Sequence, residues 1–323
     1  MDFHYNLESF NTTPIVKKYE GKSLDNLFPD HKILSNSMGQ CMEIKKEEDI
    51  SLFQLNPDLS KKRLIKNLKV VYSIGEVYER ELFKKGVRNI YDLRFNLRFR
   101  DHAKEILDLI HRKDYITLCT NRYIYDIDTS FCFKKEDLLF IDIETLGLYD
   151  SPIIIIGIGF YTSDHFVISQ YFTRDLEEEI SMLEHFKEKV FPKFKCFVSY
   201  NGKSFDIPYL ANRFLYFFDE NPMISEEDIP YDTTNTKFHH IDLYHNCRRR
   251  YKGKFEKYTL TMMEEKLLNW NRGNELPSHL VGACYKKYSD NPKRYIGLIK
   301  ECIDHNYYDI YSMPLILRNL LEY

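Results

Sequence analysis

The sequence has little of several features that would decide its class at once. No apolar run approaches the roughly 20 residues that a membrane-spanning helix needs; the most apolar run is 152–160. The first ten residues lack the apolar core of a secretory signal peptide. The seven cysteines are widely spaced and include no Cys-x-x-Cys pair, which argues against a disulfide framework and a cysteine-bound zinc ion. We therefore expect a cytoplasmic protein with no membrane contact.

The chain also lacks a strong charge of either sign. Its formal net charge is −3 over 323 residues, so a basic surface for nucleic acid would have to be local. Two basic stretches are candidates, at 61–69 and 248–254. Aromatic residues are abundant, with 25 tyrosines and 23 phenylalanines beside a single tryptophan, which argues against disorder.

Three stretches of the chain differ in pattern. Residues 1–60 have no clear period, and we assign them no role. Residues 61–120 place apolar side chains at helical spacing and predict a mainly helical region. Residues 135–323 predict a mixed α/β domain. In that domain we expect an antiparallel three-stranded meander, a helix, a strand, a helix, a strand and a helical C-terminal part, at 138–143, 152–160, 166–171, 176–190, 196–200, 207–218, 238–244 and from 257.

Two acids follow the apolar part of the first strand, in FIDIET at 140–145. Side chains on a strand alternate between its faces, so Asp142 and Glu144 point to the same side. Neighbouring carboxylates repel each other, and a shared cation removes the conflict. Mg²⁺ suits such a pair because it takes oxygen ligands and keeps several waters. By itself the pair is equally consistent with a strand end that emerges into solvent.

Two later segments carry further acids. In SYNGKSFDIPYL, residues 199–210, Asp206 stands at the start of a helix, where an acid is also favoured as a cap. In HNYYDI, residues 305–310, a helix would place His305 and Asp309 one turn apart on one face. Taken alone, such a pair is more often an ordinary surface pair than part of a site.

In this order, the three segments resemble the motifs of the DEDD exonucleases, which have an RNase H-like fold. The second motif has the form found in the proofreading domains of family B DNA polymerases. The sequence is most similar to the YprB-type RNase H-like proteins, a predicted exonuclease group, and the resemblance covers about residues 135–320. It implies an α/β domain with a central mixed sheet flanked by helices, preceded by the smaller, mainly helical region.

The resemblance also implies a mechanism. Asp142, Glu144, Asp206 and Asp309 would hold two Mg²⁺ or Mn²⁺ ions for the attack of water on a phosphodiester. His305 stands four residues before Asp309. One DEDD subclass has a tyrosine at that distance, and another has a histidine five residues before. We expect His305 to orient or deprotonate the water, a task that suits imidazole.

Contacts to nucleic acid are expected at two places in this domain. Asn201 and Phe205 belong to the second motif. Arg248, Arg249 and Arg250 begin the second basic stretch and are suited to follow the backbone of a strand that enters the site. The alternative for the three arginines is a solvated basic loop.

Residues 71–93 resemble a helix–hairpin–helix module. Ile74 and Gly75 lie in its hairpin, where exposed backbone N–H groups and a helix N-terminus can hold a phosphate without recognising sequence. A plain helical hairpin is the alternative. His239, His240 and His245 do not have the ligand spacing of a zinc site, and we expect ordinary histidines there.

We therefore expect a metal-dependent nuclease that removes nucleotides from the 3′ end of single-stranded DNA or RNA. The polarity is implied by the resemblance alone. Two alternatives stay open: a structure-selective endonuclease on the same fold, and a non-catalytic module that binds nucleic acid. Such a module usually lacks one of the acids, and all four are present here.

Overall fold

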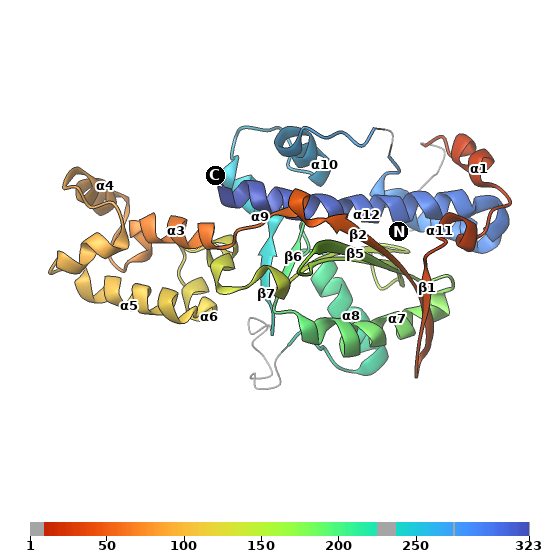
Figure 1. The fold of residues 1–323 in the computed structure, drawn as a ribbon, viewed down its shortest axis with the longest axis horizontal. Helices are drawn as coiled ribbons and strands as arrows, with labels where there is room; N and C mark the ends of the chain where they lie inside the picture. The colour runs from red at the N-terminus through yellow and green to blue at the C-terminus, as the bar shows by residue number, and fades with distance from the viewer. Residues whose placement is uncertain (1–9, 225–236, 274, 323) are drawn as a thin grey trace.

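The structure is a computed structural model that describes residues 10–224, 237–273 and 275–322. Its centre is a seven-stranded mixed sheet in the order β1-β2-β5-β4-β3-β6-β7 (Figure 1). Neighbouring strands are antiparallel from β1 to β3, which includes the predicted meander, whereas β6 and β7 run parallel to β3. The strands are β1 (Lys32–Asn36), β2 (Gly39–Asp49), β3 (Leu138–Thr145), β4 (Ile153–Tyr161), β5 (His165–Phe172), β6 (Cys196–Ser199) and β7 (His239–Asp242). The predicted α/β fold class is confirmed.

Helices cover both faces of this sheet. The long helix α12 (Pro292–Glu322) crosses one face, and α7 (Glu179–His185) and α8 (Asp206–Phe218) cover the other (Figure 1). Side chains along β3 alternate between the hydrophobic cores on the two faces of the sheet. Leu138 and Phe140 pack in the cluster that contains α12 residues, while the intervening residues pack with α7 and α8. Asp142 and Glu144 continue the first series, so they face α12.

The remaining helices lie at the ends of the chain and between these elements. They are α1 (Thr13–Tyr19), α2 (Leu24–Leu27), α3 (Asp58–Lys66), α4 (Glu76–Lys84), α5 (Arg100–Arg112), α6 (Tyr115–Cys119), α9 (Leu243–Arg250), α10 (Leu260–Met263) and α11 (Val281–Asp290), with 3₁₀ turns at Ile90–Phe95 and Asp126–Cys132 among others and π turns at Phe186–Val190 and Glu264–Leu268. No described helix is long and apolar enough to cross a membrane.

The hairpin β1–β2 extends the sheet beyond β5. Met42 lies opposite Phe172, and Ile44 lies opposite Gln170. The sequence interpretation left residues 1–60 without a role, and this part of them is an integral edge of the sheet. Strand β2 escaped prediction because its second half, KKEED, is charged and exposed rather than alternating.

Helices α3 to α6 form a separate body beside the sheet, at the left of Figure 1. They enclose an apolar core of their own, which includes Leu64, Leu82, Leu93 and Ile110. Asn89 caps the 3₁₀ turn at Ile90–Phe95, and its side chain accepts a hydrogen bond from the Asp92 N–H.

Candidate active site

The three acidic segments converge between β3 and α12. Asp142 and Glu144 lie at the end of β3, Asp206 begins α8, and Asp309 lies on α12. All four line one cavity of about 400 Å³. Three elements that are far apart in the sequence, β3, α8 and α12, thus bring the predicted carboxylates together. No single segment contains the whole set, so none of the three predicts the site alone.

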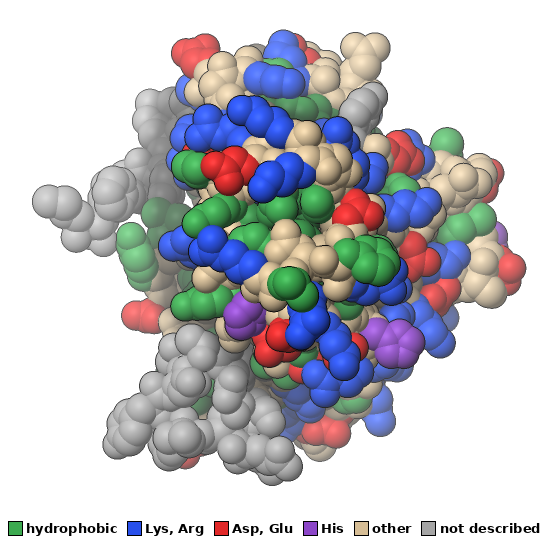
Figure 2. All heavy atoms as spheres, turned by 90° about the vertical axis from the view of Figure 1, so that its left-hand side faces the viewer, with side chains coloured by type: hydrophobic (Ala, Val, Ile, Leu, Met, Phe, Trp, Pro, Cys, Tyr) green, Lys and Arg blue, Asp and Glu red, His purple; other side chains and the backbone are tan. Residues whose placement is uncertain are grey.

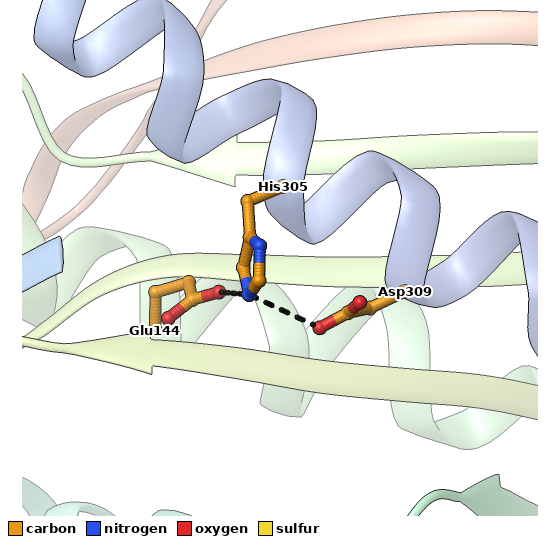
Figure 3. A group of neighbouring side chains, drawn as sticks. All are labelled: Glu144, His305 and Asp309. Carbon is orange, nitrogen blue, oxygen red and sulfur yellow. Dashed lines mark ion pairs between the residues drawn. The ribbon is translucent and has the colours of Figure 1, made fainter. Parts of the chain in front are cut away.

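His305 lies between Glu144 and Asp309 (Figure 3). Its Nε2 is 3.7 Å from Glu144 Oε1 and 3.5 Å from Asp309 Oδ2. One ligand atom from each of the three residues lies within 4.8 Å of the other two. On its far side, His305 Nδ1 is 2.8 Å from Glu275 Oε1. The ring is therefore held at Nδ1 by one carboxylate, while Nε2 faces the site and also lies 3.0 Å from Ser278 Oγ.

Burial opposes a charge on His305, but its neighbours outweigh that effect. Desolvation lowers the pKa of the imidazole, while Asp309, Glu275 and Glu144 raise it, to about 10 overall. In the absence of a cation, the ring is therefore protonated and balances part of the negative charge around it.

Burial and the neighbouring negative charges make the carboxyl groups resist ionisation. Burial raises the pKa of Asp142 well above its ordinary range, and the charges of Asp309, Asp206 and Glu144 raise it further. Burial raises the pKa of Glu144 to about 8 despite the favourable charge of His305. It raises the pKa of Asp206 to about 7 despite hydrogen bonds from backbone N–H groups. The protein groups around these acids do not by themselves balance their full negative charge.

Asn306 links Asp142 on β3 to Gln170 on β5. Its Nδ2 donates to Asp142 Oδ2 over 2.8 Å, and its Oδ1 accepts from Gln170 Nε2 over 2.9 Å. Gly157 lies between Asp142 and Gln170 in the sheet register, directly under this amide. A Cβ at Gly157 would be 2.2 Å from Asn306 Oδ1, so only glycine lets α12 approach this closely.

We expect Gly157→Ala to lower both stability and activity. The new methyl group must displace Asn306, so overpacking should cost about 1–3 kcal/mol of unfolding free energy. Loss of the amide that holds Asp142 should reduce hydrolysis about 10- to 100-fold. Thermal unfolding and nuclease assays measure the two effects. Gly75→Ala is the control for stability alone, because a Cβ there meets nothing within 4 Å but Gly75 is itself a candidate phosphate contact. Wild-type values for both properties in Gly157→Ala would contradict this role.

The turn before α8 positions Asp206. Asn201 adopts a left-handed conformation, with φ of 67°, and the Gly202 N–H donates to Ser199 Oγ over 3.1 Å. Asp206 is the first residue of α8 and does not cap it; its Oδ1 accepts the Ile143 N–H over 3.0 Å. The capping interpretation therefore does not describe this carboxylate.

Arg272 is a component that the sequence analysis missed. Its guanidinium is almost fully buried and lies 2.6 Å from Asp309 Oδ1 and 2.7 Å from Glu275 Oε1. It also pairs with Glu264. These residues lie in a segment without a recognisable motif, and only the fold brings them to α12. Arg272 holds Asp309 and also pairs with Glu275, which holds His305.

The donor set fits divalent cations of the Mg²⁺ or Mn²⁺ kind. Such ions take carboxylate oxygens, and ligating carboxylates are usually oriented by a second layer of donors. Three of the four carboxylates here have one oxygen held in this way: by Asn306 for Asp142, by the Ile143 N–H for Asp206, and by Arg272 for Asp309. A cation would also relieve the repulsion that the raised pKa values reveal.

Only some of the residues predicted to contact nucleic acid lie at the cavity of the acids. Asn201 and Phe205 line the same cavity as the acids. Arg248 and Arg249 lie near the end of α9, but Arg249 Nη2 is 3.3 Å from the carboxylate of Asp126. Arg249 therefore also joins α9 to the 3₁₀ turn Asp126–Cys132.

The other two arginines of the basic stretch, and the histidines of β7, contact other parts of the protein. Arg248 lies over the ring of Tyr244, with Cζ 5.4 Å from its centroid, and Arg250 ends α9. His239 Nε2 is 2.9 Å from the Asp126 carbonyl oxygen, and His240 Nε2 is 2.7 Å from Ser199 Oγ. His239 and His240 thus have structural partners, consistent with the expectation of ordinary histidines.

The hairpin residues lie apart from this site, in the helical body. Ile74 is buried in the helical core, and Gly75 precedes the first turn of α4. Both line a cavity of about 600 Å³ together with Lys69, His102 and Arg122. This arrangement keeps the hairpin a candidate phosphate contact.

Comparison with known proteins agrees with the fold. A family model described as the RNase_H superfamily matches residues 139–321, and the chain belongs to this superfamily. The chain is also similar to an uncharacterized protein YprB of Bacillus subtilis (strain 168), with 27% identity over 215 residues. That match covers 66% of this chain and 48% of the relative, so the chain spans about half of the relative's length.

Proposed function

We propose that this protein is a metal-dependent nuclease that hydrolyses the phosphodiester bonds of single-stranded DNA or RNA. The observation that carries the proposal is the convergence of Asp142, Glu144, Asp206 and Asp309 on one cavity beside His305. A cluster of buried acids with raised pKa values around a histidine lowers the stability of the fold. Such clusters are found mainly at functional sites. Removal of nucleotides from the 3′ end follows the resemblance to the DEDD exonucleases.

In the proposed hydrolysis, each group of the site has a separate role. Bound Mg²⁺ or Mn²⁺ would supply charge neutralisation and a more acidic water. His305 Nε2 faces Glu144 and Asp309, and it would accept the proton of the attacking water there once bound cations have displaced the proton that the ring carries in the metal-free protein. Glu275 holds Nδ1 and keeps the ring in this orientation. Arg272 holds Oδ1 of Asp309, so that Oδ2 remains turned toward His305.

The deciding experiment is digestion of end-labelled single-stranded DNA and RNA with Mg²⁺ or Mn²⁺. We expect stepwise loss of nucleotides from the 3′ end, abolished by a chelator and by Asp142→Ala. A labelled 5′ end separates this outcome from the alternatives. Short internal fragments would favour a structure-selective endonuclease. Binding without any cleavage, with either metal, would favour a non-catalytic module.

Two further variants separate the proposed roles within the site. His305→Ala should remove the proton acceptor, whereas Glu275→Gln keeps a hydrogen-bonding group behind the ring and should retain part of the activity. Equal and complete loss in both variants, with unchanged melting temperatures, would show that Glu275 does more than position His305.

A further inference from the structure

A second surface, remote from the carboxylates, has the composition of a binding site. It is formed by residues 77–100, from α4 through the 3₁₀ turn Ile90–Phe95 to the start of α5. Figure 2 faces the end of the molecule that the helical body forms, and it shows apolar side chains interleaved with lysine and arginine. We call residues 77–100 the arginine–aromatic surface.

Apolar side chains on this surface are unusually exposed. Phe95 is 87% exposed and Leu97 is 83% exposed, and Tyr78 and Tyr91 contribute partly exposed rings. Phe99, in the same short sequence RFNLRFR, is buried in the helical core. The segment is therefore anchored by one ring while its neighbours point into solvent. A cluster of exposed large apolar side chains on a folded protein marks an interaction site.

The charge of this surface opposes that of the whole chain. Residues 77–100 contain seven lysines and arginines and three acids, a local charge of +4, whereas the chain has −3. Of the three acids, Asp92 already accepts the backbone N–H groups of Arg88 and Asn89. In the part of the chain that the structure describes, Arg94 and Arg98 form no ion pair with a carboxylate.

The arginines lie against the rings rather than against acids. Arg98 Cζ is 4.4 Å from the centroid of the Tyr78 ring, and Arg94 Cζ is 5.4 Å from that of Tyr91. The other basic candidate differs, because Arg249 pairs with Asp126. The positive charge of the arginine–aromatic surface therefore remains available to an anionic partner.

We propose that the arginine–aromatic surface binds a single strand of DNA or RNA. The identity of this ligand rests on the proposed nuclease function. Exposed rings stack on unpaired bases, and arginines between them pair with phosphates, which is how proteins hold single strands without sequence preference. A duplex keeps its bases stacked inside and would use only the cations. Phe95 and Leu97 therefore favour a single strand over a duplex, and the surface docks the substrate outside the catalytic cavity.

Binding is best measured on the full chain carrying Asp142→Ala, in a chelator, so that the result does not depend on hydrolysis. The probes are fluorescent oligothymidylate and oligouridylate of about 16 nucleotides, the upper range of such sites, and a DNA duplex of equal length. Phe95→Ala combined with Leu97→Ala should weaken single-strand binding at least about tenfold and leave duplex binding nearly unchanged. Met38→Ala, at the exposed β1–β2 turn, is the matched control.

The outcomes separate this surface from the catalytic proposal. Unchanged single-strand affinity in the Phe95–Leu97 variant would overturn the docking surface, whether or not the wild-type protein digests nucleic acid. Equal weakening for single strand and duplex would also overturn it, because the two apolar side chains would then not distinguish unpaired bases from a duplex. Reduced single-strand affinity without any digestion by the wild type would support the surface and reject the nuclease. Binding of neither probe would indicate a protein partner instead. With wild-type residue 142, the Phe95–Leu97 variant should lose activity on long strands but not on short oligonucleotides.

Discussion

Asp206→Asn is expected to make the metal-free protein more stable while it abolishes hydrolysis. Asparagine keeps an oxygen that accepts the Ile143 N–H, now 3.0 Å away, and removes a carboxyl whose pKa burial raises to about 7. At pH 8 the gain should be on the order of 1–3 kcal/mol, or at least about 2 °C in melting temperature. Loss of a metal-binding oxygen removes several kcal/mol of transition-state stabilisation, about a thousandfold in rate.

Asp126→Asn provides a control with the opposite sign. Asp126 is also a buried acid, but Lys203 lies 2.6 Å away and the Asn246 side chain and Asp242 backbone N–H donate to it. Although burial opposes ionisation, these partners lower its pKa to about 2. Its neutralisation should destabilise the protein. If thermal unfolding with a chelator showed Asp206→Asn to be the less stable of the two, Asp206 would be a structural acid rather than a metal ligand.

The sequence was sufficient for the parts of the fold in which burial and spacing agree. The meander at 138–172 is apolar over most of its length, and its strands follow one another directly in the chain. The hairpin β1–β2 could not be predicted in the same way. Its partner β5 lies over a hundred residues later, and the half of β2 that carries charge gives no strand pattern.

The same contrast applies to the site. The four acids could be predicted because the order of their three segments resembles the motifs of the DEDD exonucleases. The residues that hold them could not, because Glu275 and Arg272 have no distinctive spacing and reach α12 only through tertiary packing. The role of Gly157 depends on how closely Asn306 approaches the sheet, a distance that no sequence pattern contains. Arg249 was predicted from charge alone, which does not reveal its ion pair with Asp126.

Metal-free protein should lose stability steadily as the pH rises from 7 to 9. The pKa of Glu144 is raised to about 8 and that of His305 to about 10, so the folded protein retains protons that the unfolded chain has released. Stability from such groups is present below their unfolded pKa values and is lost as the pH approaches the folded ones. Histidines with lowered pKa values, such as His240, are neutral in both states above pH 7 and do not contribute.

Addition of Mn²⁺ should reverse this trend, because cations bind the deprotonated carboxylates and displace the protons. Thermal unfolding at pH 7, 8 and 9, with a chelator and with excess Mn²⁺, should therefore show a metal-induced increase in melting temperature that grows with pH. Glu144→Gln is the matched variant, since it removes one of the titrating groups and should flatten both curves. A metal-induced increase that is the same at every pH, or absent, would mean that the acids between β3 and α12 do not exchange protons for a cation, and the proposed nuclease chemistry would lose its basis.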